Sequence, residues 1–277
     1  MSRTCATMVV HELLVETVPG YREARLQAEA FTRRSVAQAV ARTEPVKLQT
    51  VVHVVFRTDD ENLSDEQIQS QLDVLNRDFR AQNEDRTQVP EPWQPLVADA
   101  LVEFELAEVT RTKTDEESFG ADDSVKALVP PQPDRLNVWV CSLGGGLLGY
   151  AQFPGWPAET DGVVILNRAF GTTGTAAAPF DGGRTAVHEV GHWLGLRHIW
   201  GDMNDCTGTD FVEDTPPAQQ ANTGTPEWPH ITCDNGPNGD MFMNYMDYVD
   251  DAAMFMFTAG QVARMDATLA GPRSSLA

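Results

Sequence analysis

Basic residues are scarce in this 277-residue sequence, which has 20 Lys and Arg against 41 Asp and Glu and a formal net charge of −21. Nucleic acid and anionic membranes repel an acidic surface, so the composition argues against both as partners and favours cations. Long apolar runs are missing too. None approaches the ~20 residues that cross a bilayer, so we expect no membrane span. The chain also lacks low-complexity tracts and solenoid repeats, which leaves a globular protein of one sizeable domain or two unequal lobes.

Only four cysteines are present, too few for a disulfide scaffold. Cys206 and Cys233 bracket a stretch rich in Gly, Asn, Asp and Pro, where a disulfide would pin a long loop and imply an oxidising compartment. Cys141 lies in the strand-like run LNVWVCSL, which predicts a buried thiol. Cys5 lies in RTCAT near the start and has no obvious partner.

The first residues do not resemble a signal peptide, because His11, Glu12 and Glu16 interrupt the apolar region that one requires. Either a signal was trimmed or the protein is not secreted by that route. Charge is also unevenly distributed. Residues 1–43 contain six Arg and four Glu and are net +2, whereas the remaining chain is net −23. We therefore expect the basic arm to dock on the acidic body.

Hydrophobic periodicity predicts an α/β body. The Ala-, Gln- and Arg-rich stretch Arg22–Ala41 predicts a helix that ends at a boundary near Pro45. VKLQTVVHVVF predicts a buried strand. LSDEQIQSQLDVLNRDFRAQN predicts an amphipathic helix on a sheet, with Ser64 as N-cap and Gln67 as its capping partner. Further strands are predicted at Leu101–Glu108, Leu136–Cys141, Leu147–Gln152 and Gly162–Leu166.

The second half is poorer in periodic structure. A helix is predicted over Thr185–Leu196, followed by a non-periodic region over Trp200–Asn244 and a last helix opening at Thr258, with Gln261 as its capping partner. A structureless stretch that long needs something other than a core to order it, and a metal ion together with a disulfide would serve.

The stretch RTAVHEVGHWLGLRHIWGD carries the clearest chemical signal. His188 and His192 are four residues apart, so on a helix they project from one face as two ligands of one ion must. Glu189 lies beside that ion as a candidate general base. Gly195 can adopt φ > 0 and end the helix, and His198 then returns as a third ligand.

Three neutral imidazoles with an open fourth position are typical of a catalytic zinc site. The alternative is an amphipathic helix with incidental surface histidines. Five residues in register make that coincidence improbable, since together they form H-E-x-x-H-x-x-G-x-x-H.

This motif resembles that of the metzincins. A metzincin carries a methionine turn downstream, and MNYMDY fits it, with Met246 as the hydrophobic floor under the zinc. HEVGHWLGLRHIWGD, VEDTPPAQ, NYMDYVDD, LNVWVCSLGGGLLGYAQFPG and LSDEQIQSQLDVLNRDF together resemble the pappalysin family, particularly its small ulilysin-like members. The resemblance covers most of Lys47–Leu269.

The resemblance implies an α/β metzincin-like catalytic domain. It would contain a twisted mixed sheet, an active-site helix and a backing helix above a loop-rich C-terminal subdomain, preceded by a short pro-segment. We expect the inhibitory pro-segment at residues 1–42 and the catalytic domain at 43–277, with an upper sheet subdomain at about 43–195 and a lower loop-rich subdomain at about 196–277.

The resemblance also implies site residues. The phenol of Tyr248 would stabilise the oxyanion of the tetrahedral intermediate, the alternative being a core tyrosine. Asp210, Asp214 and Thr215 would bind one or two structural calcium ions, the alternative being a solvated acidic loop. An exposed edge strand would pair with extended substrate, although its glycines could equally form a turn. That strand comprises Gly146, Leu147, Leu148, Gly149 and Tyr150.

Similar zymogens bind a pro-segment cysteine to the zinc, which implies that Cys5 is a zinc ligand in the latent state. The alternative is a free terminal cysteine. Self-processing would cut Ala41–Arg42 and leave Arg42 as the new N-terminus. Ulilysin-like members favour Arg or Lys after the scissile bond through an acidic pocket, to which Asp250 and Asp251 could contribute.

The sequence thus predicts a latent zinc metalloendopeptidase in which Glu189 activates the attacking water. Its expected partners are protein or peptide substrates and its own pro-segment. Secretion is expected, although no signal peptide is visible. Two alternatives remain, a zinc hydrolase of small amides and a non-catalytic metal-binding module.

Overall fold

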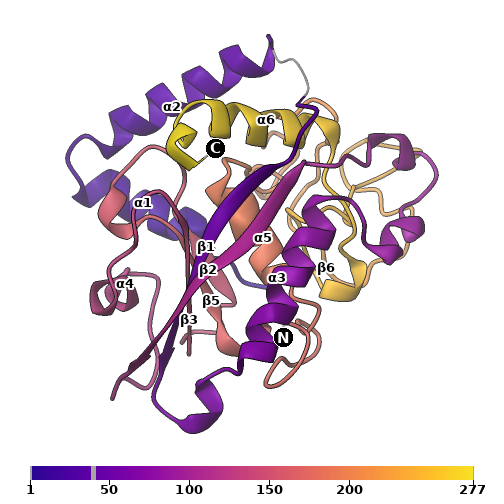
Figure 1. The fold of residues 1–277 in the computed structure, drawn as a ribbon. Helices are drawn as coiled ribbons and strands as arrows, with labels where there is room; N and C mark the ends of the chain where they lie inside the picture. Colours follow the sequence, from indigo (N-terminus) through magenta and orange to yellow (C-terminus); the bar gives the residue numbers. More distant parts are fainter. Residues whose placement is uncertain (1, 39–41, 277) are drawn as a thin grey trace.

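The computed structural model describes residues 2–38 and 42–276, and a five-stranded sheet forms its centre (Figure 1). Strand order is β2-β1-β3-β5-β4; four strands run parallel, and β4 pairs antiparallel with β5 at one edge. The strands are β1 (Val46–Phe56), β2 (Val102–Lys113), β3 (Leu136–Cys141), β4 (Gly149–Ala151) and β5 (Val163–Leu166). The predicted α/β fold with a mixed sheet is confirmed.

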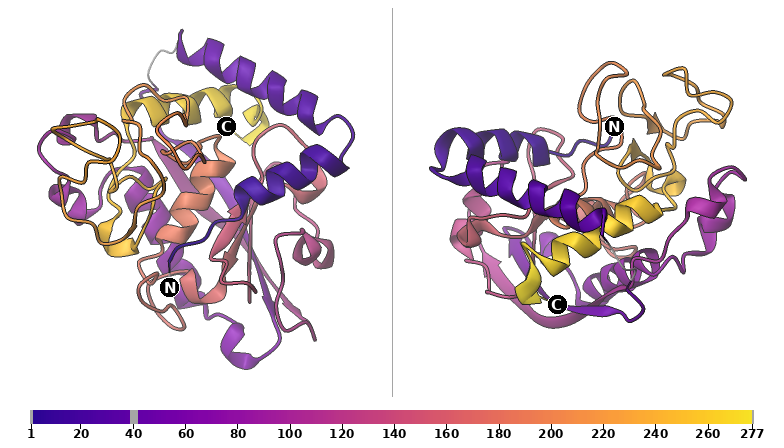
Figure 2. Two further views of the ribbon diagram at one scale, coloured as in Figure 1. Left: turned by 180° about the vertical axis from the view of Figure 1, so that it is seen from behind. Right: turned by 90° about the horizontal axis from the view of Figure 1, so that it is seen from above.

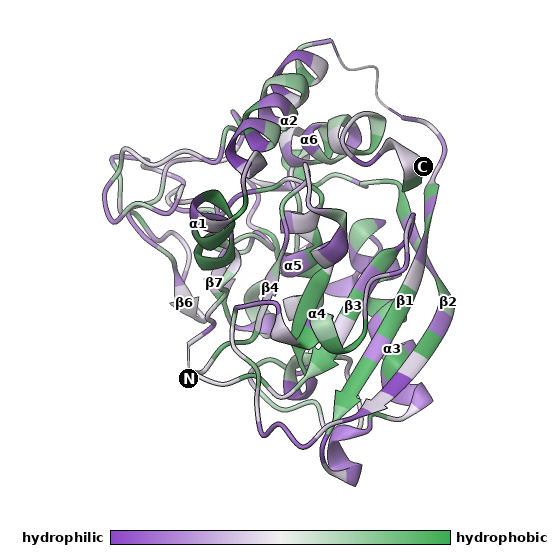
Figure 3. Cartoon of the chain, turned by 90° about the vertical axis from the view of Figure 1, so that its left-hand side faces the viewer, coloured by the Kyte–Doolittle hydropathy of each residue, from purple (hydrophilic) through white to green (hydrophobic). Residues whose placement is uncertain are grey.

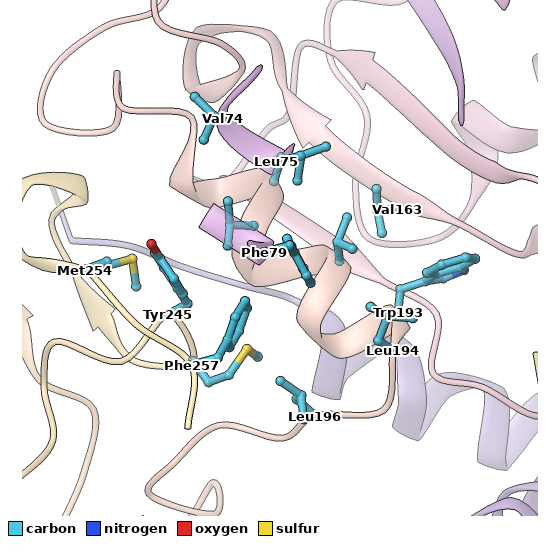
Figure 4. Close-up of a cluster of buried hydrophobic side chains, with 14 of the residues drawn as sticks. Val74, Leu75, Phe79, Val163, Trp193, Leu194, Leu196, Tyr245, Met254 and Phe257 are labelled. Atoms are coloured by element: carbon cyan, nitrogen blue, oxygen red, sulfur yellow. The ribbon is translucent and has the colours of Figure 1, made fainter. Parts of the chain in front are cut away.

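Helices α3 (Asp65–Phe79) and α5 (Arg184–Trp193) pack side by side on one face of this sheet. Ser64 caps α3 as predicted, because its side chain accepts a hydrogen bond from the backbone N–H of Gln67. The main hydrophobic core lies between these helices, the sheet and the C-terminal half (Figure 4). Its labelled members are Val74, Leu75, Phe79, Val163, Trp193, Leu194, Leu196, Tyr245, Met254 and Phe257.

On the opposite face, the β4 end of the sheet packs against the N-terminal segment, which we define as residues 2–36. It folds as α1 (Thr7–Thr17) and α2 (Tyr21–Val36), and α1 is largely apolar (Figure 3). Strand residues that point away from the main core, including Trp139 and Tyr150, pack with α1 in a second cluster. The short helix α4 (Ser124–Leu128) adds Val125 to that cluster.

The C-terminal half is built mainly of loops. Between α5 and α6 (Ala259–Ala270), the described residues form only β6 (Thr223–Gly224), β7 (Tyr248–Val249) and a 3-10 turn. Helix α6 lies beside α2 (Figures 1 and 2), and its N-cap Thr258 forms the predicted capping box with Gln261. The 3-10 turns of the chain span Asp59–Glu61, Glu84–Gln88, Gln94–Leu96, Ala158–Thr160, Asn167–Ala169, Asp251–Ala253 and Ser274–Leu276.

Several predicted bounds were wrong. Helix α5 ends at Trp193 rather than Leu196, because Gly195 adopts φ +92°. Strand β4 has three residues rather than the six of Leu147–Gln152, whereas β2 continues past Glu108 to Lys113 beside the full length of β1. Helix α2 ends at Val36, whereas the helix was predicted to continue to Ala41, a residue outside the described ranges.

Helix α1 was not predicted at all. No helix among the described residues is long and apolar enough to cross a membrane.

Candidate metal centre

The three motif histidines converge as the sequence predicts. Helix α5 projects His188 and His192 from one face, and the turn at Gly195 brings His198 back beside them. The Nε2 atom of His192 lies 3.1 Å from that of His188 and 3.0 Å from that of His198. Such separations are close to those of neighbouring vertices in a tetrahedral site with metal–nitrogen bonds of ~2.0–2.1 Å.

Hydrogen bonds on the far side of each ring fix its orientation. The Nδ1 atoms donate to the Tyr245 carbonyl at 2.7 Å, the Leu196 carbonyl at 2.9 Å and an Asp202 carboxylate oxygen at 2.5 Å. This pattern leaves each Nε2 lone pair facing the common centre. Burial, followed by the neighbouring imidazoles, holds the pKa of His188 and of His192 well below the usual value, so both rings are neutral. A set of neutral, oriented imidazoles fits a divalent metal ion.

Cys5, near the N-terminus, is the fourth residue of this group. One ligand atom each from Cys5, His188, His192 and His198 lies within 4.8 Å of all the others. Across the described residues, no further group of three or more His, Cys, Asp or Glu side chains gathers in this way. Burial, followed by the charge of Glu189, raises the pKa of the Cys5 thiol well above its usual value.

Glu189 lies beside the histidines without joining their cluster. Its Oε2 atom accepts a hydrogen bond from the Thr7 hydroxyl at 2.9 Å and from the Cys5 thiol at 3.4 Å. Burial raises the pKa of Glu189 to about 7. Strand β4 passes close by, because a Cβ added to Gly149 would lie 3.0 Å from the Glu189 Cγ. The carboxylate therefore lies between the histidine centre and the edge strand.

Met246 lies beneath the centre. It is fully buried, and a Cβ added to Gly191 of α5 would come within 2.5 Å of its sulfur. Asn244 holds the turn, since its Oδ1 accepts from the Met246 N–H at 2.9 Å while its amide pairs with Gln261 of α6. The methionine turn predicted from MNYMDY thus contacts the helix that carries the first two histidines.

Tyr248 faces the same centre. Its ring lies 4.9 Å from the ring of His198 and 5.7 Å from that of His188, centroid to centroid. Its hydroxyl donates to the Cys5 carbonyl at 3.2 Å.

The outer edge of β4 is paired with the N-terminal segment. Cys5 and Gly149 form a parallel bridge, in which the Ala6 N–H donates to the Gly149 carbonyl at 3.0 Å. The Leu148 N–H donates to the Thr4 carbonyl, also at 3.0 Å. The segment crosses in front of α5 (Figure 2, left).

The five residues predicted to form the substrate-binding edge strand occupy three different positions. Leu148 and Gly149 pair with the segment, whereas Gly146, at φ +77°, and Leu147 lie in the turn before the strand. Tyr150 points into the second hydrophobic cluster.

Arg3 was not singled out from the sequence, although it lies two residues before Cys5. Its Nη2 contacts an Asp251 oxygen at 2.5 Å, its Nε donates to the Val249 carbonyl at 3.1 Å, and its Nη1 donates to the Thr185 hydroxyl at 3.0 Å. The guanidinium also lies 5.0 Å from the Phe180 ring centroid. Arg3 and Asp251 are both buried, so this ion pair is shielded from solvent.

Asp251 itself is fixed by the protein. Its second oxygen accepts from the backbone N–H groups of Gly182 and Arg184 at 2.8 and 3.2 Å. Asp250, the other acid named from the sequence, is half-buried, and the polar partners of the Arg3 guanidinium are Asp251, Val249 and Thr185 instead.

The predicted calcium residues are only partly brought together. The Asp210 carboxylate accepts from the Thr215 hydroxyl at 2.8 Å and from the Val212 N–H at 3.0 Å. The Asp214 carboxylate instead accepts from the Thr258 hydroxyl at 2.6 Å and the Gly260 N–H at 2.8 Å, at the start of α6.

The remaining predictions concern cysteines and the processing site. Cys206 and Cys233 form the predicted disulfide, and Cys141 is a buried free thiol. Arg42 forms an ion pair with Asp266 of α6. Ala41 lies outside the described residues.

Comparisons with known proteins agree with this geometry. The sequence model of the peptidase M43 family, described as pregnancy-associated plasma protein-A, matches residues 123–270. An extracellular metalloprotease 1 of Coccidioides posadasii is 35% identical over 80% of this chain and 76% of its own length.

Solved structures agree as well. A Tannerella forsythia promirolysin mutant superposes with a TM-score of 0.90 at 42% identity, covering 99% of this chain and 97% of that one. Mature mirolysin in complex with a cleaved peptide superposes with a TM-score of 0.82 at 45% identity, covering 85% of this chain and 96% of that one.

Proposed function

The chain belongs to the pappalysin family and is a metalloendopeptidase, and from this we propose that it is a zinc enzyme held latent by its own N-terminal segment. The observation that carries the proposal is the gathering of His188, His192, His198 and Cys5 around one centre, with Glu189 beside it. Three ligands come from the motif, and the fourth comes from the chain's own start.

The histidines would hold the zinc ion through Nε2. When bound, zinc supplies Lewis-acid polarisation and lowers the pKa of water toward ~7. Imidazole donors suit zinc, although they suit other divalent transition metals too.

Glu189 would act as general base and then as general acid. It lies beside the histidines and at β4, where the peptide backbone of a substrate would pair, so it could take the proton from the attacking water and deliver it to the leaving amine. Its carboxylate now binds Thr7 and Cys5, which keeps it from water.

Tyr248 would donate its phenolic hydrogen bond to the oxyanion that develops at the scissile carbonyl. The contact with the Cys5 carbonyl supports this role, because a peptide carbonyl already occupies that donor.

Latency would arise because the N-terminal segment fills each of these positions at once. Cys5 would be the fourth zinc ligand, the segment would cover the β4 edge, and Tyr248 would be engaged. Residues 1–42 would be the pro-segment and 43–277 the catalytic domain, divided near residue 195. The two mirolysin forms support this boundary, since they differ in coverage by 14% of this chain, or about 39 residues. Cleavage of Ala41–Arg42 fits that length.

A preference for Arg or Lys after the scissile bond is supported by Arg3. The pocket formed by Asp251, Val249 and Thr185 already binds a guanidinium next to the metal centre. A charge-assisted bond of this kind contributes ~1.5–3 kcal/mol, equivalent to about tenfold or more in preference.

Calcium and secretion complete the proposal. Asp210 and Thr215 would contribute oxygens to one or two calcium ions, and Asp214 would offer its remaining lone pairs. The disulfide and the extracellular relative support secretion.

Casein digestion by the processed chain tests the proposal. We expect hydrolysis that a zinc chelator abolishes and added zinc restores, with Glu189→Gln as the inactive, correctly folded control. Cleavage of small amides alone would favour the amide hydrolase, and zinc binding without any hydrolysis would favour a non-catalytic module.

A further inference from the structure

The surface that binds the N-terminal segment is larger than blocking the metal centre requires. Val10 and Tyr21 are almost completely buried in the second hydrophobic cluster, among Phe119, Trp139 and Tyr150 of the catalytic domain. This cluster is therefore a hydrophobic core built from both parts of the chain. The N-terminal segment supplies helix α1, and the catalytic domain supplies the strand side chains.

Helix α2 adds a second, polar attachment. Glu29 accepts two hydrogen bonds from Arg264 of α6, at 3.2 and 2.9 Å. Arg33 lies 4.2 Å from the ring centroid of Phe211, and Arg25 donates to the Pro154 carbonyl. None of these contacts involves a histidine of the metal centre.

The described residues of the connection make fewer contacts. Ala37, Gln38, Thr43 and Glu44 are exposed. Arg42 pairs with Asp266 of α6 and stays with the catalytic domain after a cut at Ala41–Arg42. All the attachments of α1 and α2 described above lie before residue 37. Cutting the connection therefore leaves them intact and removes only the high effective concentration that a short covalent link provides.

We propose that the catalytic domain retains the N-terminal segment as a separate, tightly bound inhibitory peptide after the connection is cut. The binding surface is the apolar face around Trp139 and Tyr150 together with the Arg264–Phe211 rim, and its partner is the amphipathic α1–α2 hairpin. Activation then takes two steps, in which the first cut creates a nicked, inactive complex and loss of the peptide creates the active enzyme. This inference rests on the proposed function.

The first test replaces residues 37–43 with the recognition sequence of an unrelated protease. After that protease nicks the chain, we expect the two fragments to co-elute on gel filtration and casein hydrolysis to stay below about a tenth of the final value. Brief treatment with mild denaturant, followed by removal of the peptide, should then raise activity at least tenfold.

The second test adds a synthetic peptide of residues 2–36 to the separated enzyme. We expect half-inhibition at or below about 1 μM, the affinity range of a modest specific interface. Two matched peptides separate docking from non-specific effects. Val10→Asp places a charge in the apolar cluster and should weaken inhibition at least tenfold, whereas Val9→Asp changes a neighbouring residue that is 59% exposed and should inhibit like the parent.

The outcomes separate the two proposals. If the separated enzyme never cleaves casein, the proposed function fails. Retention is wrong if nicking alone gives full activity, the fragments separate on the column and the peptide fails to inhibit an enzyme that does cleave casein.

Discussion

Acid should loosen the N-terminal segment through His11. This side chain lies in α1, where its Nδ1 is 3.1 Å from the Tyr21 hydroxyl and its ring packs edge-on against Phe153 of the catalytic domain. Burial, followed by the positive charges of Arg25, Arg197 and Arg22, lowers the pKa of His11 from 6.5 to about 4.

The direction of the effect follows from proton binding. While the segment is docked, His11 remains neutral down to about pH 4, whereas in a released segment it binds a proton below about 6.5. Release therefore takes up a proton, and docking weakens as pH falls from about 6.5 toward 4. At pH 5.5 the full shift would favour release by about tenfold relative to neutral pH, and solvent screening at the half-buried ring makes this an upper value.

Alkylation of Cys5 measures this equilibrium, because its thiol is covered while the segment is docked. The assay would follow labelling by mass spectrometry between pH 7.5 and 5.5, in Glu189→Ala chains that cannot process themselves. Dividing the rate by that of a matched His11→Gln chain removes the intrinsic pH dependence of thiol reactivity and of the metal ligands. We expect the ratio to rise several-fold, up to tenfold, as pH falls. A ratio that stays constant across this range would refute the reasoning.

Four further outcomes are expected. Glu189→Ala should retain stoichiometric metal by elemental analysis but lose at least the ~10²-fold in casein hydrolysis typical of a missing general base; near-normal activity would contradict its role. Cys5→Ala should yield a precursor that matures faster on a gel time course, whereas unchanged latency would mean that the segment blocks substrate sterically. Millimolar calcium should raise the melting temperature relative to EGTA by binding only the folded state, and identical values would count against the site. Asp251→Asn should reduce the preference for Arg or Lys in a peptide-library profile about tenfold or more; an unaltered profile would place the specificity elsewhere.

The metal centre could be predicted because its geometry is local. His188 and His192 are related by one helical turn, and Gly195 fixes where that turn ends. The four-residue separation of the two histidines therefore already determines how close their side chains lie in the fold. Cys5 is about 180 residues from these ligands, and only the resemblance to known zymogens could associate it with them.

Features that depend on distant packing were predicted less well. The stretch TMVVHELLVET forms α1, and its apolar residues are buried against β3 and β4. Because these strands come more than a hundred residues later, the sequence near α1 does not show what buries it. The sequence also does not show that the Asp214 carboxylate accepts hydrogen bonds from residues at the start of α6. The role of Arg3 could not be predicted from its neighbours in the sequence, because its main partner, Asp251, lies far away along the chain.

The second hydrophobic cluster has a consequence for the behaviour of the enzyme in concentrated solution. When α1 leaves, side chains such as Phe119, Trp139 and Tyr150 lose their cover, and apolar patches of this kind promote self-association. The departing arm also takes away positive charge, so the body that remains carries a net charge of about −23. Two such bodies repel each other at low ionic strength, and salt screens that repulsion within a few ångströms to about a nanometre. Self-association of the processed enzyme should therefore increase with salt, whereas the precursor, whose patch is covered, should respond less.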